Sequence, residues 1–319
     1  MESIPPHYSE QEILAFLHEH YQLQGELKAL PGYIDQNFIL ICSVAVSEHS
    51  KQKYIVKIAN SEESIVELEM QNKAMQHLSA KGLNVPHVFA NARNKTITSV
   101  GHVGAKTFSL RVLSYLEGSF YADTQSKDHN EKLWQSLGRF VGDIDSALAD
   151  FAHQGSHRLM SWDLAYGLNV CQAKKSVLDE QQINLVEYFI DQYQSYVLPV
   201  IGKLPMGVIH NDANDMNVLV DDALKPRGVS GVIDFGDMVH SQLINDLAIT
   251  CAYALMHHED PMKPLLSIVE GYHRSRALIK DEQEVLITLI ALRLCVSVCH
   301  SSEGIKANPE NTYLVVSAK

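Results

Sequence analysis

The stretch Val208-Ile209-His210-Asn211-Asp212-Ala213-Asn214-Asp215-Met216-Asn217-Val218-Leu219-Val220 decides the fold. Two apolar runs enclose a polar segment in which a His-x-Asp triplet ends at Asp212 and Asn217 follows five positions later. A further apolar run then opens the stretch Gly231-Val232-Ile233-Asp234-Phe235-Gly236-Asp237. Short apolar runs bounded by polar residues are typical of buried strands. We therefore expect carboxylate and amide side chains to be held rigidly where these strands end.

This spacing predicts a phosphoryl-transfer site of the kinase type. Transfer to an alcohol requires a hydroxyl in line with the γ-phosphate and an acceptor for its proton, and Asp212 is the candidate catalytic base. Asn217 and Asp234 are candidate Mg²⁺ ligands, because Mg²⁺ prefers oxygen donors and uses few protein ligands when phosphate is present. Any one of the three could be an ordinary turn residue, but their shared spacing favours a site.

Two further polar residues are expected to support the loop. We predict that His210 packs and hydrogen-bonds so that it fixes the loop, which is more common than proton transfer for such a histidine. Asp246 lies early in the helix that follows the metal motif, where it either caps that helix or braces the loop.

Lys57 is the candidate phosphate clamp. It stands within the apolar strand Tyr54–Ile58, and a buried charge requires a partner. The phosphates and a helix carboxylate would be those partners, with Glu69 preferred over Glu67 for the carboxylate. The alternative is an edge-strand lysine with its head in water.

The backbone of Ser114, Tyr115 and Leu116 is expected to recognise adenine, because a hinge strand presents unpaired N–H and C=O groups. The loop from Gly32 to Asn37 could fold over the phosphates, but it lacks a G-x-G-x-x-G pattern and a plain hairpin turn is equally compatible.

Composition limits the remaining possibilities. The chain has 319 residues, 46% of them hydrophobic, and its net charge is -12, so it can bury a substantial core in two domains. No basic block is present, which argues against a nucleic-acid partner. Five scattered cysteines fit a reducing, cytoplasmic location. We expect no signal peptide at the amino terminus and no membrane-spanning run.

The predicted organisation is α+β and bilobal. The first third of the chain reads as an antiparallel sheet with one crossing helix, after a short helix from Glu10 to His20. Long amphipathic helices dominate after Gly118. We therefore predict a small β-rich N-lobe at residues 1–113, a hinge at 114–118 and a larger, mainly helical C-lobe at 119–319.

At these residues the chain resembles the aminoglycoside phosphotransferase and choline kinase superfamily, which has a protein-kinase-like fold. The family's H-G-D-x-x-x-x-N stands here as His210 to Asn217, its I-D-F/W-G/E as Ile233 to Gly236, and its D-L-A as Asp246 to Ala248. These matches imply a base, metal ligands and a loop-supporting aspartate. Asn211 replaces the usual glycine, and Asn tolerates similar backbone conformations.

Finer features resemble the hydroxylysine kinase branch. They are Pro31 to Phe38, Glu69 to Asn72, Arg158 with Trp162-Asp163-Leu164, Gly236 to Val239, Arg293 to Val298, and Asn311 to Leu314. The resemblance implies transfer of the γ-phosphate of ATP or GTP, with Mg²⁺, to the hydroxyl of an amino alcohol or hydroxy amino acid such as hydroxylysine. Relatives of this branch also occur fused to other enzyme domains, and the chain ends at Lys319 where one more helix is expected. Membership of a larger fused chain therefore stays open.

An amino alcohol needs its ammonium group held by a carboxylate or an aromatic face. Asp237, just past the metal motif, and the pair Trp162-Asp163 are the candidates for that pocket. For Trp162 and Asp163, ordinary packing and capping are equally compatible with the sequence.

Other functions remain to be weighed against this one. Homoserine kinase would use the same machinery on a different substrate. A non-catalytic nucleotide-binding module of a larger enzyme is a second alternative, although Lys57, Asp212, Asn217 and Asp234 are all retained. A protein kinase is disfavoured, because no Ala-Pro-Glu follows Asp234.

Overall fold

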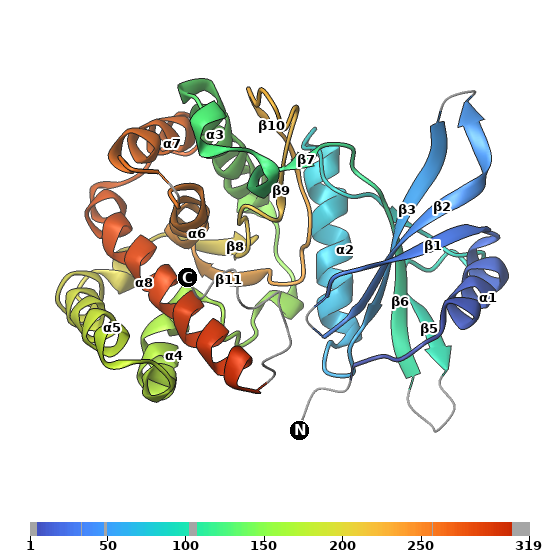
Figure 1. The fold of residues 1–319 in the computed structure, drawn as a ribbon, viewed down its shortest axis with the longest axis horizontal. Coiled ribbons are helices and arrows are strands. Elements are labelled where there is room, and N and C mark those ends of the chain that lie inside the picture. Colours follow the sequence, from blue (N-terminus) through green and yellow to red (C-terminus); the bar gives the residue numbers. More distant parts are fainter. Residues whose placement is uncertain (1–4, 33, 48–49, 102–106, 257, 308–319) are drawn as a thin grey trace. The chain divides into compact units, whose positions relative to one another are not determined.

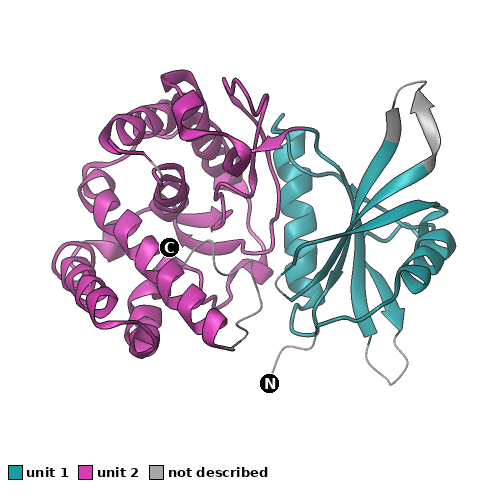
Figure 2. Ribbon diagram, in the orientation of Figure 1, with its two compact units in different colours: residues 1–117 teal, residues 118–319 magenta. Residues whose placement is uncertain are grey.

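The computed structural model describes residues 5–32, 34–47, 50–101, 107–256 and 258–307. The chain divides into two compact units, residues 1–117 and 118–319 (Figure 2). The division falls inside the segment that the sequence predicts as a hinge. The last of the branch motifs, Asn311 to Leu314, lies outside the described residues, as does Tyr33 of the first.

Unit 1 is an antiparallel sheet with one helix on each face (Figure 1). The predicted sheet with its crossing helix is thereby confirmed, and so is the helix at the start of the chain. The strands follow the order β1-β2-β3-β6-β4, and β5 also pairs with β6. Their bounds are Gly25–Leu30 (β1), Gln36–Ser47 (β2), Ser50–Ala59 (β3), Val88–Phe89 (β4), Thr98–Gly101 (β5) and Thr107–Ser114 (β6). The helices are α1 (Glu10–Tyr21) and α2 (Ile65–Ala80).

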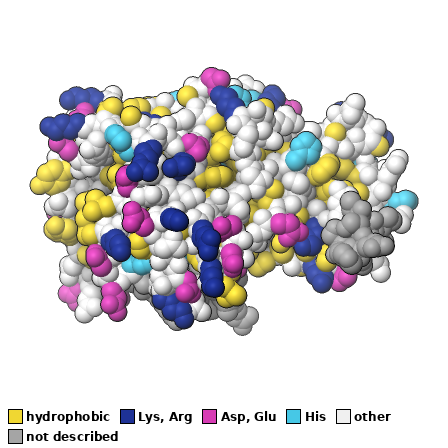
Figure 3. Space-filling view, turned by 90° about the horizontal axis from the view of Figure 1, so that it is seen from above, with side chains coloured by type: hydrophobic (Ala, Val, Ile, Leu, Met, Phe, Trp, Pro, Cys, Tyr) yellow, Lys and Arg dark blue, Asp and Glu magenta, His cyan; other side chains and the backbone are white. Residues whose placement is uncertain are grey.

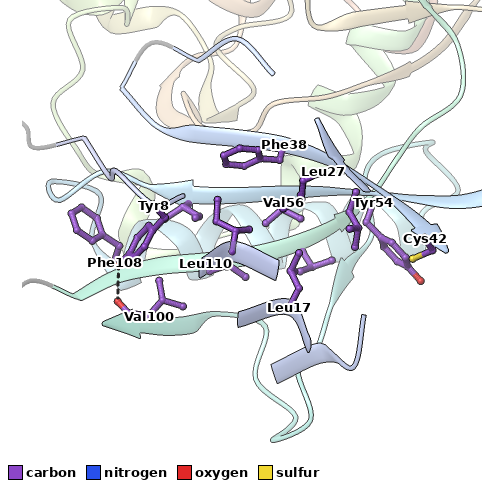
Figure 4. Packing of buried hydrophobic residues seen from close by; sticks show 14 residues of the cluster. Tyr8, Leu17, Leu27, Phe38, Cys42, Tyr54, Val56, Val100, Phe108 and Leu110 are labelled. Carbon is purple, nitrogen blue, oxygen red and sulfur yellow. Dashed lines mark hydrogen bonds between the residues drawn. The ribbon is translucent and has the colours of Figure 1, made fainter. Parts of the chain in front are cut away.

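One hydrophobic cluster of unit 1 lies on the α1 face of the sheet (Figure 4). Side chains alternate between the two faces of a strand, and Tyr54, Val56 and Ile58 of β3 all enter this cluster. The hydroxyl of Tyr8 donates to the backbone oxygen of Val100 at 3.2 Å, as the dashed line in Figure 4 shows. Tyr54, Val56 and Ile58 of β3 are thus committed to this face.

Lys57 of β3 lies on the opposite face, which α2 covers. Its cross-strand partner on β6 is Arg111, and such partners share a face. The Nη1 of Arg111 donates to the Oδ1 of Asn72 on α2 at 3.0 Å. Lys57 is therefore carried on the side of the sheet where polar groups meet the helix.

Unit 2 combines short strands with long helices. One sheet has the order β10-β9-β7, and β11 pairs with β8. The strands are β7 (Ser119–Phe120), β8 (Met206–Ile209), β9 (Val218–Val220), β10 (Val229–Val232) and β11 (Val239–Gln242). The helices are α3 (Glu131–Ala147), α4 (Gly167–Lys174), α5 (Glu180–Gln192), α6 (Ile244–Ala254), α7 (Met262–Ser275) and α8 (Lys280–Ala307). The predicted mainly helical lobe is confirmed, whereas α4 was not predicted, because it has only eight residues and a glycine start.

Helices α3 and α7 approach each other closely because glycines face across their contact. A Cβ placed on Gly138 of α3 would lie 1.8 Å from the backbone oxygen of Ile268 on α7. One placed on Gly271 of α7 would lie 2.1 Å from the backbone oxygen of Gln135. Neither position has room for any side chain, so these glycines set the spacing of what we call the α3–α7 seam.

Helix α8 qualifies the expectation that no segment could cross a membrane. The segment Lys280–Lys306 is long and apolar enough to do so by length and composition alone. In the structure, 61% of its most apolar window is buried inside the protein. A core helix of a globular domain has the same properties.

On the face drawn in Figure 3, basic and acidic side chains are interspersed.

Candidate active site

The loop between β8 and β9 carries Asp212 and Asn217 in direct contact. The Nδ2 of Asn217 donates to the Oδ2 of Asp212 at 2.7 Å and to its backbone oxygen at 2.9 Å. The Nδ2 of Asn214 donates to the other carboxylate oxygen of Asp212 at 2.9 Å. These bonds use the nitrogen of the Asn217 amide, so its oxygen is left for another partner. Within the described part of the chain, that oxygen accepts no hydrogen bond.

The backbone of this loop is anchored by Asp246 of α6. Its Oδ2 accepts from the backbone N–H of His210 at 2.9 Å, and its Oδ1 accepts from that of Asn211 at 2.6 Å. Asn211 has a φ of 65°, in the left-handed region that Gly and Asn adopt most readily. The side chain of Asp246 is buried and makes no capping bond to α6 itself. The sequence left two roles open for Asp246, capping of the helix and bracing of the loop. These contacts brace the loop.

His210 links the loop to the segment that follows β10. Its Nε2 donates to the backbone oxygen of Ile233 at 3.1 Å, and its Nδ1 accepts from the backbone N–H of Asp212 at 3.3 Å. The ring packs edge-on against Phe235 with centroids 4.8 Å apart. Burial lowers the pKa of His210, which favours the neutral ring that these two bonds require. Such contacts position the loop and leave no free nitrogen for proton transfer.

Asp234 stands where this second segment turns. Its φ is 59°, a conformation that is uncommon outside glycine and often marks a functional position. The side chain is exposed, and its Oδ1 accepts from the backbone N–H of Gly236 at 3.3 Å. The backbone N–H of Ile233 donates to the backbone oxygen of Asn217 at 2.9 Å. The two predicted metal ligands are therefore carried by segments that are joined directly.

These residues fit a Mg²⁺ ion bound together with a nucleotide. Asn217 offers an amide oxygen without a hydrogen bond in the described structure, and Asp234 offers an exposed carboxylate. Burial and the neighbouring Asp237 raise the pKa of Asp212 well above its usual range, and Asp234 adds to the effect. Acidic side chains this close repel one another, and a divalent cation relieves that repulsion. Two protein ligands are typical for Mg²⁺ when phosphates complete its shell.

Arg293 of α8 is a contact of Asp212 that the sequence motifs did not predict. Its side chain is only 2% exposed, and its Nη2 donates to the Oδ1 of Asp212 at 3.2 Å. Its Nη1 donates to the backbone oxygen of Trp162 at 2.8 Å, and the guanidinium lies 4.8 Å from the centroid of that ring. A single charge inside an apolar helical run was the signal that could have found it, because such a charge needs a buried partner.

Arg158 holds the turn that carries Asp237. Its Nε donates to the backbone oxygen of Met238 at 3.0 Å, and its Nη2 donates to that of Gly236. Both bonds go to backbone, so the guanidinium positions the turn. Asp237 is half-buried. Its charge raises the pKa of Asp212, so Asp237 lies near the candidate base.

The prediction that Asp163 lines a substrate pocket is wrong. Asp163 is buried, and its Oδ1 accepts from the backbone N–H of Ala165 at 3.0 Å and from the Ser241 hydroxyl at 2.7 Å. It caps the short 3₁₀ helix Leu164–Tyr166, which is the capping alternative raised from the sequence. Trp162 is half-buried and stacks on His300 with centroids 4.2 Å apart.

The predicted pairing of Lys57 with Glu69 is also wrong. Among the described residues, Glu69 makes no hydrogen bond or ion pair, and its side chain is exposed on α2. Its helix neighbours Leu68 and Met70 are both buried instead. Lys57 itself is half-buried.

The backbone groups of the predicted hinge differ in whether they are hydrogen-bonded. The N–H of Ser114 donates to the backbone oxygen of His87 at 2.8 Å, so it is not an unpaired donor and that part of the prediction is wrong. Tyr115 and Leu116 follow the end of β6. In the part of the chain that the structure describes, their backbone groups have no hydrogen bond, as adenine recognition requires.

Comparison with known proteins identifies the family of this chain. The model of the phosphotransferase enzyme family (APH) matches residues 30–282, and the chain belongs to this family. It is 27% identical to hydroxylysine kinase of Xenopus laevis, over 98% of this chain and 88% of that protein. It is 26% identical to hydroxylysine kinase of Mus musculus over 99% and 88%, and 24% identical to homoserine kinase of Zymomonas mobilis over 88% and 82%.

Solved structures confirm the kinase-like fold. An amicoumacin kinase, hAmiN, in complex with AMP-PNP, Ca²⁺ and Ami has a TM-score of 0.75 at 18% identity, covering 98% of this chain and 91% of that one. A microcompartment-associated aminopropanol kinase has a TM-score of 0.76 at 16% identity, covering 97% and 94%. The chain is thus a small-molecule kinase that acts on a hydroxyl group. The comparisons give no support to a larger fused chain.

Proposed function

We propose that the protein transfers the γ-phosphoryl group of magnesium-bound ATP or GTP to the hydroxyl group of hydroxylysine. The observation that carries this proposal is the contact between Asp212 and Asn217, which orients a carboxylate and leaves an amide oxygen beside it. Similarity to hydroxylysine kinases over nearly the whole chain supports the choice of substrate.

In this reaction the substrate oxygen forms a bond to the γ-phosphorus, and the bond from that phosphorus to the bridging oxygen breaks. Asp212 takes the hydroxyl proton, and the nucleoside diphosphate carries away the bridging oxygen. Asn217 and Asp234 would hold Mg²⁺, which neutralises charge on the phosphates. Asp237 would attract a substrate ammonium group.

The nucleotide is assigned to residues of unit 1. Lys57 would contact its phosphates, because its ammonium group is carried on a rigid strand. The backbone of Tyr115 and Leu116 would recognise the adenine or guanine ring through the groups that the described structure leaves without hydrogen bonds.

Homoserine kinase is the second candidate, because two homoserine kinases are 24% and 26% identical to this chain. Homoserine has the same α-amino acid group and a primary hydroxyl, so it would use the same base and metal ligands. The non-catalytic module is the third, and it differs from both because it predicts nucleotide binding without turnover.

A coupled assay for release of ADP or GDP tests all three. Each nucleotide is paired with hydroxylysine, homoserine, choline, ethanolamine or an aminoglycoside, with and without Mg²⁺. We expect the highest kcat/KM with hydroxylysine and a loss of kcat of at least about 10³-fold in Asp212→Asn, in the upper range for a general base. Asp191→Asn, an exposed residue of α5, is the matched control and should behave as wild type.

The outcomes separate the candidates. A preference for homoserine would replace the substrate and keep the mechanism. Magnesium-dependent nucleotide binding without turnover of any acceptor would favour the module. Undiminished turnover in Asp212→Asn would remove Asp212 as the base.

A further inference from the structure

Two buried carboxyl groups meet behind the candidate active site. Asp145 of α3 is 1% exposed and Asp246 of α6 is fully buried. The helices that carry them pack against each other, and each carboxyl group alters the pKa of the other. Among the described residues, neither carboxyl group has an ion pair with a Lys or Arg side chain. Two ionised carboxylates cannot share such a site without a large electrostatic cost.

The hydrogen bonds identify which of the two is ionised. Both oxygens of Asp246 accept from backbone N–H groups, those of His210 and Asn211, as a carboxylate does. The Oδ2 of Asp145 accepts from the hydroxyl of Tyr272 on α7. Its Oδ1 is buried and receives no hydrogen bond from any described group. A buried acceptor without a donor is costly, but a proton on that oxygen turns it into a donor toward Asp246.

We infer that Asp145 is protonated in the native protein and donates a hydrogen bond to Asp246, so that this carboxyl–carboxylate pair positions the catalytic loop. Asp145 touches neither loop nor substrate and acts through Asp246. It is therefore a positioning residue. The effect expected on turnover rests on the proposed function, whereas the effect on stability does not.

The charged and titratable groups around the pair do not offset the two acids. Tyr272 faces Asp145 from α7, and His210 faces Asp246 from the loop. Arg276, which follows α7, donates to the Tyr272 hydroxyl at 3.2 Å and forms an ion pair with Glu282 of α8 at 2.7 Å. Its ion pair is with Glu282, and its charge opposes the rise in the pKa of Asp145 only in part.

Burial and the neighbouring Asp246 raise the pKa of Asp145 well above its usual range, although Tyr272 and Arg276 oppose the shift. The pKa of Asp246 is raised by burial too, but the N–H bonds from His210 and Asn211 and the bond from Asp145 oppose that rise. This difference agrees with a proton that resides on Asp145.

The proton has a signature in the pH dependence of stability. Between the unfolded-state pKa of an aspartate, near 3.9, and the raised native pKa, the folded protein holds one proton that the unfolded chain has lost. In that window Asp145 makes the folding equilibrium less favourable by up to about tenfold for each unit that pH rises. Asp145→Asn keeps a hydrogen-bond donor at this position but binds no proton on folding. The substitution therefore removes this pH-dependent contribution to stability.

The experiment compares wild type, Asp145→Asn and Asp145→Ala by urea unfolding and by kcat for hydroxylysine at pH values from 5 to 9. Asp145→Asn should keep kcat within about threefold and should gain stability relative to wild type as pH rises. Asp145→Ala should lose kcat by about ten- to a hundredfold, because the Asp246 oxygen loses its donor. Asp143→Asn on the same helix is the matched control and should follow wild type throughout.

A stability difference between Asp145→Asn and wild type that does not change with pH would overturn the proposal. So would a loss of kcat in Asp145→Asn as large as that in Asp145→Ala. If these variants do not fold, infrared spectroscopy of wild type decides the matter. A protonated carboxylic acid band at neutral pH that shifts in Tyr272→Phe supports the pair, and its absence overturns it. If no acceptor is phosphorylated at all, the stability series still tests the proton.

Discussion

The α3–α7 seam leads to a prediction whose size follows from the structure. In Gly138→Ala, the new methyl group would lie 1.8 Å from the backbone oxygen of Ile268 and 2.8 Å from the backbone nitrogen of Tyr272. An ordinary contact begins at 3.4 Å, so α7 must retreat by about 1.6 Å (3.4 less 1.8). Overpacking of this kind costs typically 1–3 kcal/mol. We expect the upper end, about 3 kcal/mol, because backbone atoms cannot rotate away.

Alanine also favours a helix over glycine by about 1 kcal/mol, so the net loss should be about 2 kcal/mol. For a unit of about 200 residues this lowers Tm by roughly 4–8 °C. Thermal unfolding followed by circular dichroism measures the change. Gly202→Ala is the matched control, because nothing lies within 4 Å of its Cβ position, and it should stay within about 0.5 kcal/mol of wild type.

The same substitution reaches the active site through Tyr272. If α7 retreats, the Tyr272 hydroxyl draws away from Asp145, and kcat should fall together with stability. Equal melting temperatures for Gly138→Ala and Gly202→Ala would show that the two helices are not in backbone contact, and the reasoning about their spacing would be refuted.

Three further predictions concern single side chains. Arg293→Met should lower the free energy of unfolding by about 2 kcal/mol. This is less than the 3–5 kcal/mol typical of a fully buried pair, because Asp212 is 21% exposed. Urea unfolding measures the change, and an unchanged midpoint would contradict the prediction. Asn217→Ala should raise the Mg²⁺ concentration for half-maximal turnover by about 10–100-fold, measured by ADP or GDP release, and an unaltered requirement would exclude it as a ligand. Burial, followed by the neighbouring His258, lowers the pKa of His129 to about 4. Its contribution to stability should therefore be complete above pH 6.5 and be lost as pH falls toward 4, and His129→Gln should flatten that part of a stability–pH curve.

The part of the site that the sequence predicts best is local. Asp212 and Asn217 are five residues apart on one short loop, and the two strands that enclose them fix their contact. The apolar runs that mark those strands are visible without any tertiary information. The same holds for the sheet of unit 1 and for the long amphipathic helices, whose periodicity shows directly which face is buried.

The predicted roles of Glu69 and Asp163 were wrong because tertiary packing sets the exposure of both side chains. The side chain of Glu69 is exposed, although its helix neighbours Leu68 and Met70 are both buried. Asp163 looks available in the sequence, but Ser241, which lies 78 residues later, buries and binds it. Neither fact can be read from local pattern, because both depend on which elements pack together.

The least predictable features are the long-range contacts that hold the loop. Arg293 lies 81 residues from Asp212, and the anchoring Asp246 lies 36 residues from the N–H of His210. Each is a polar group inside an apolar interior, where an unmatched partner is costly and a matched one fixes a single geometry. Apolar packing alone would stabilise the unit without deciding where the Asp212 carboxylate points. Packing of the periodic apolar side chains therefore forms the two units. A few buried charges at large sequence separation then give the catalytic loop one conformation.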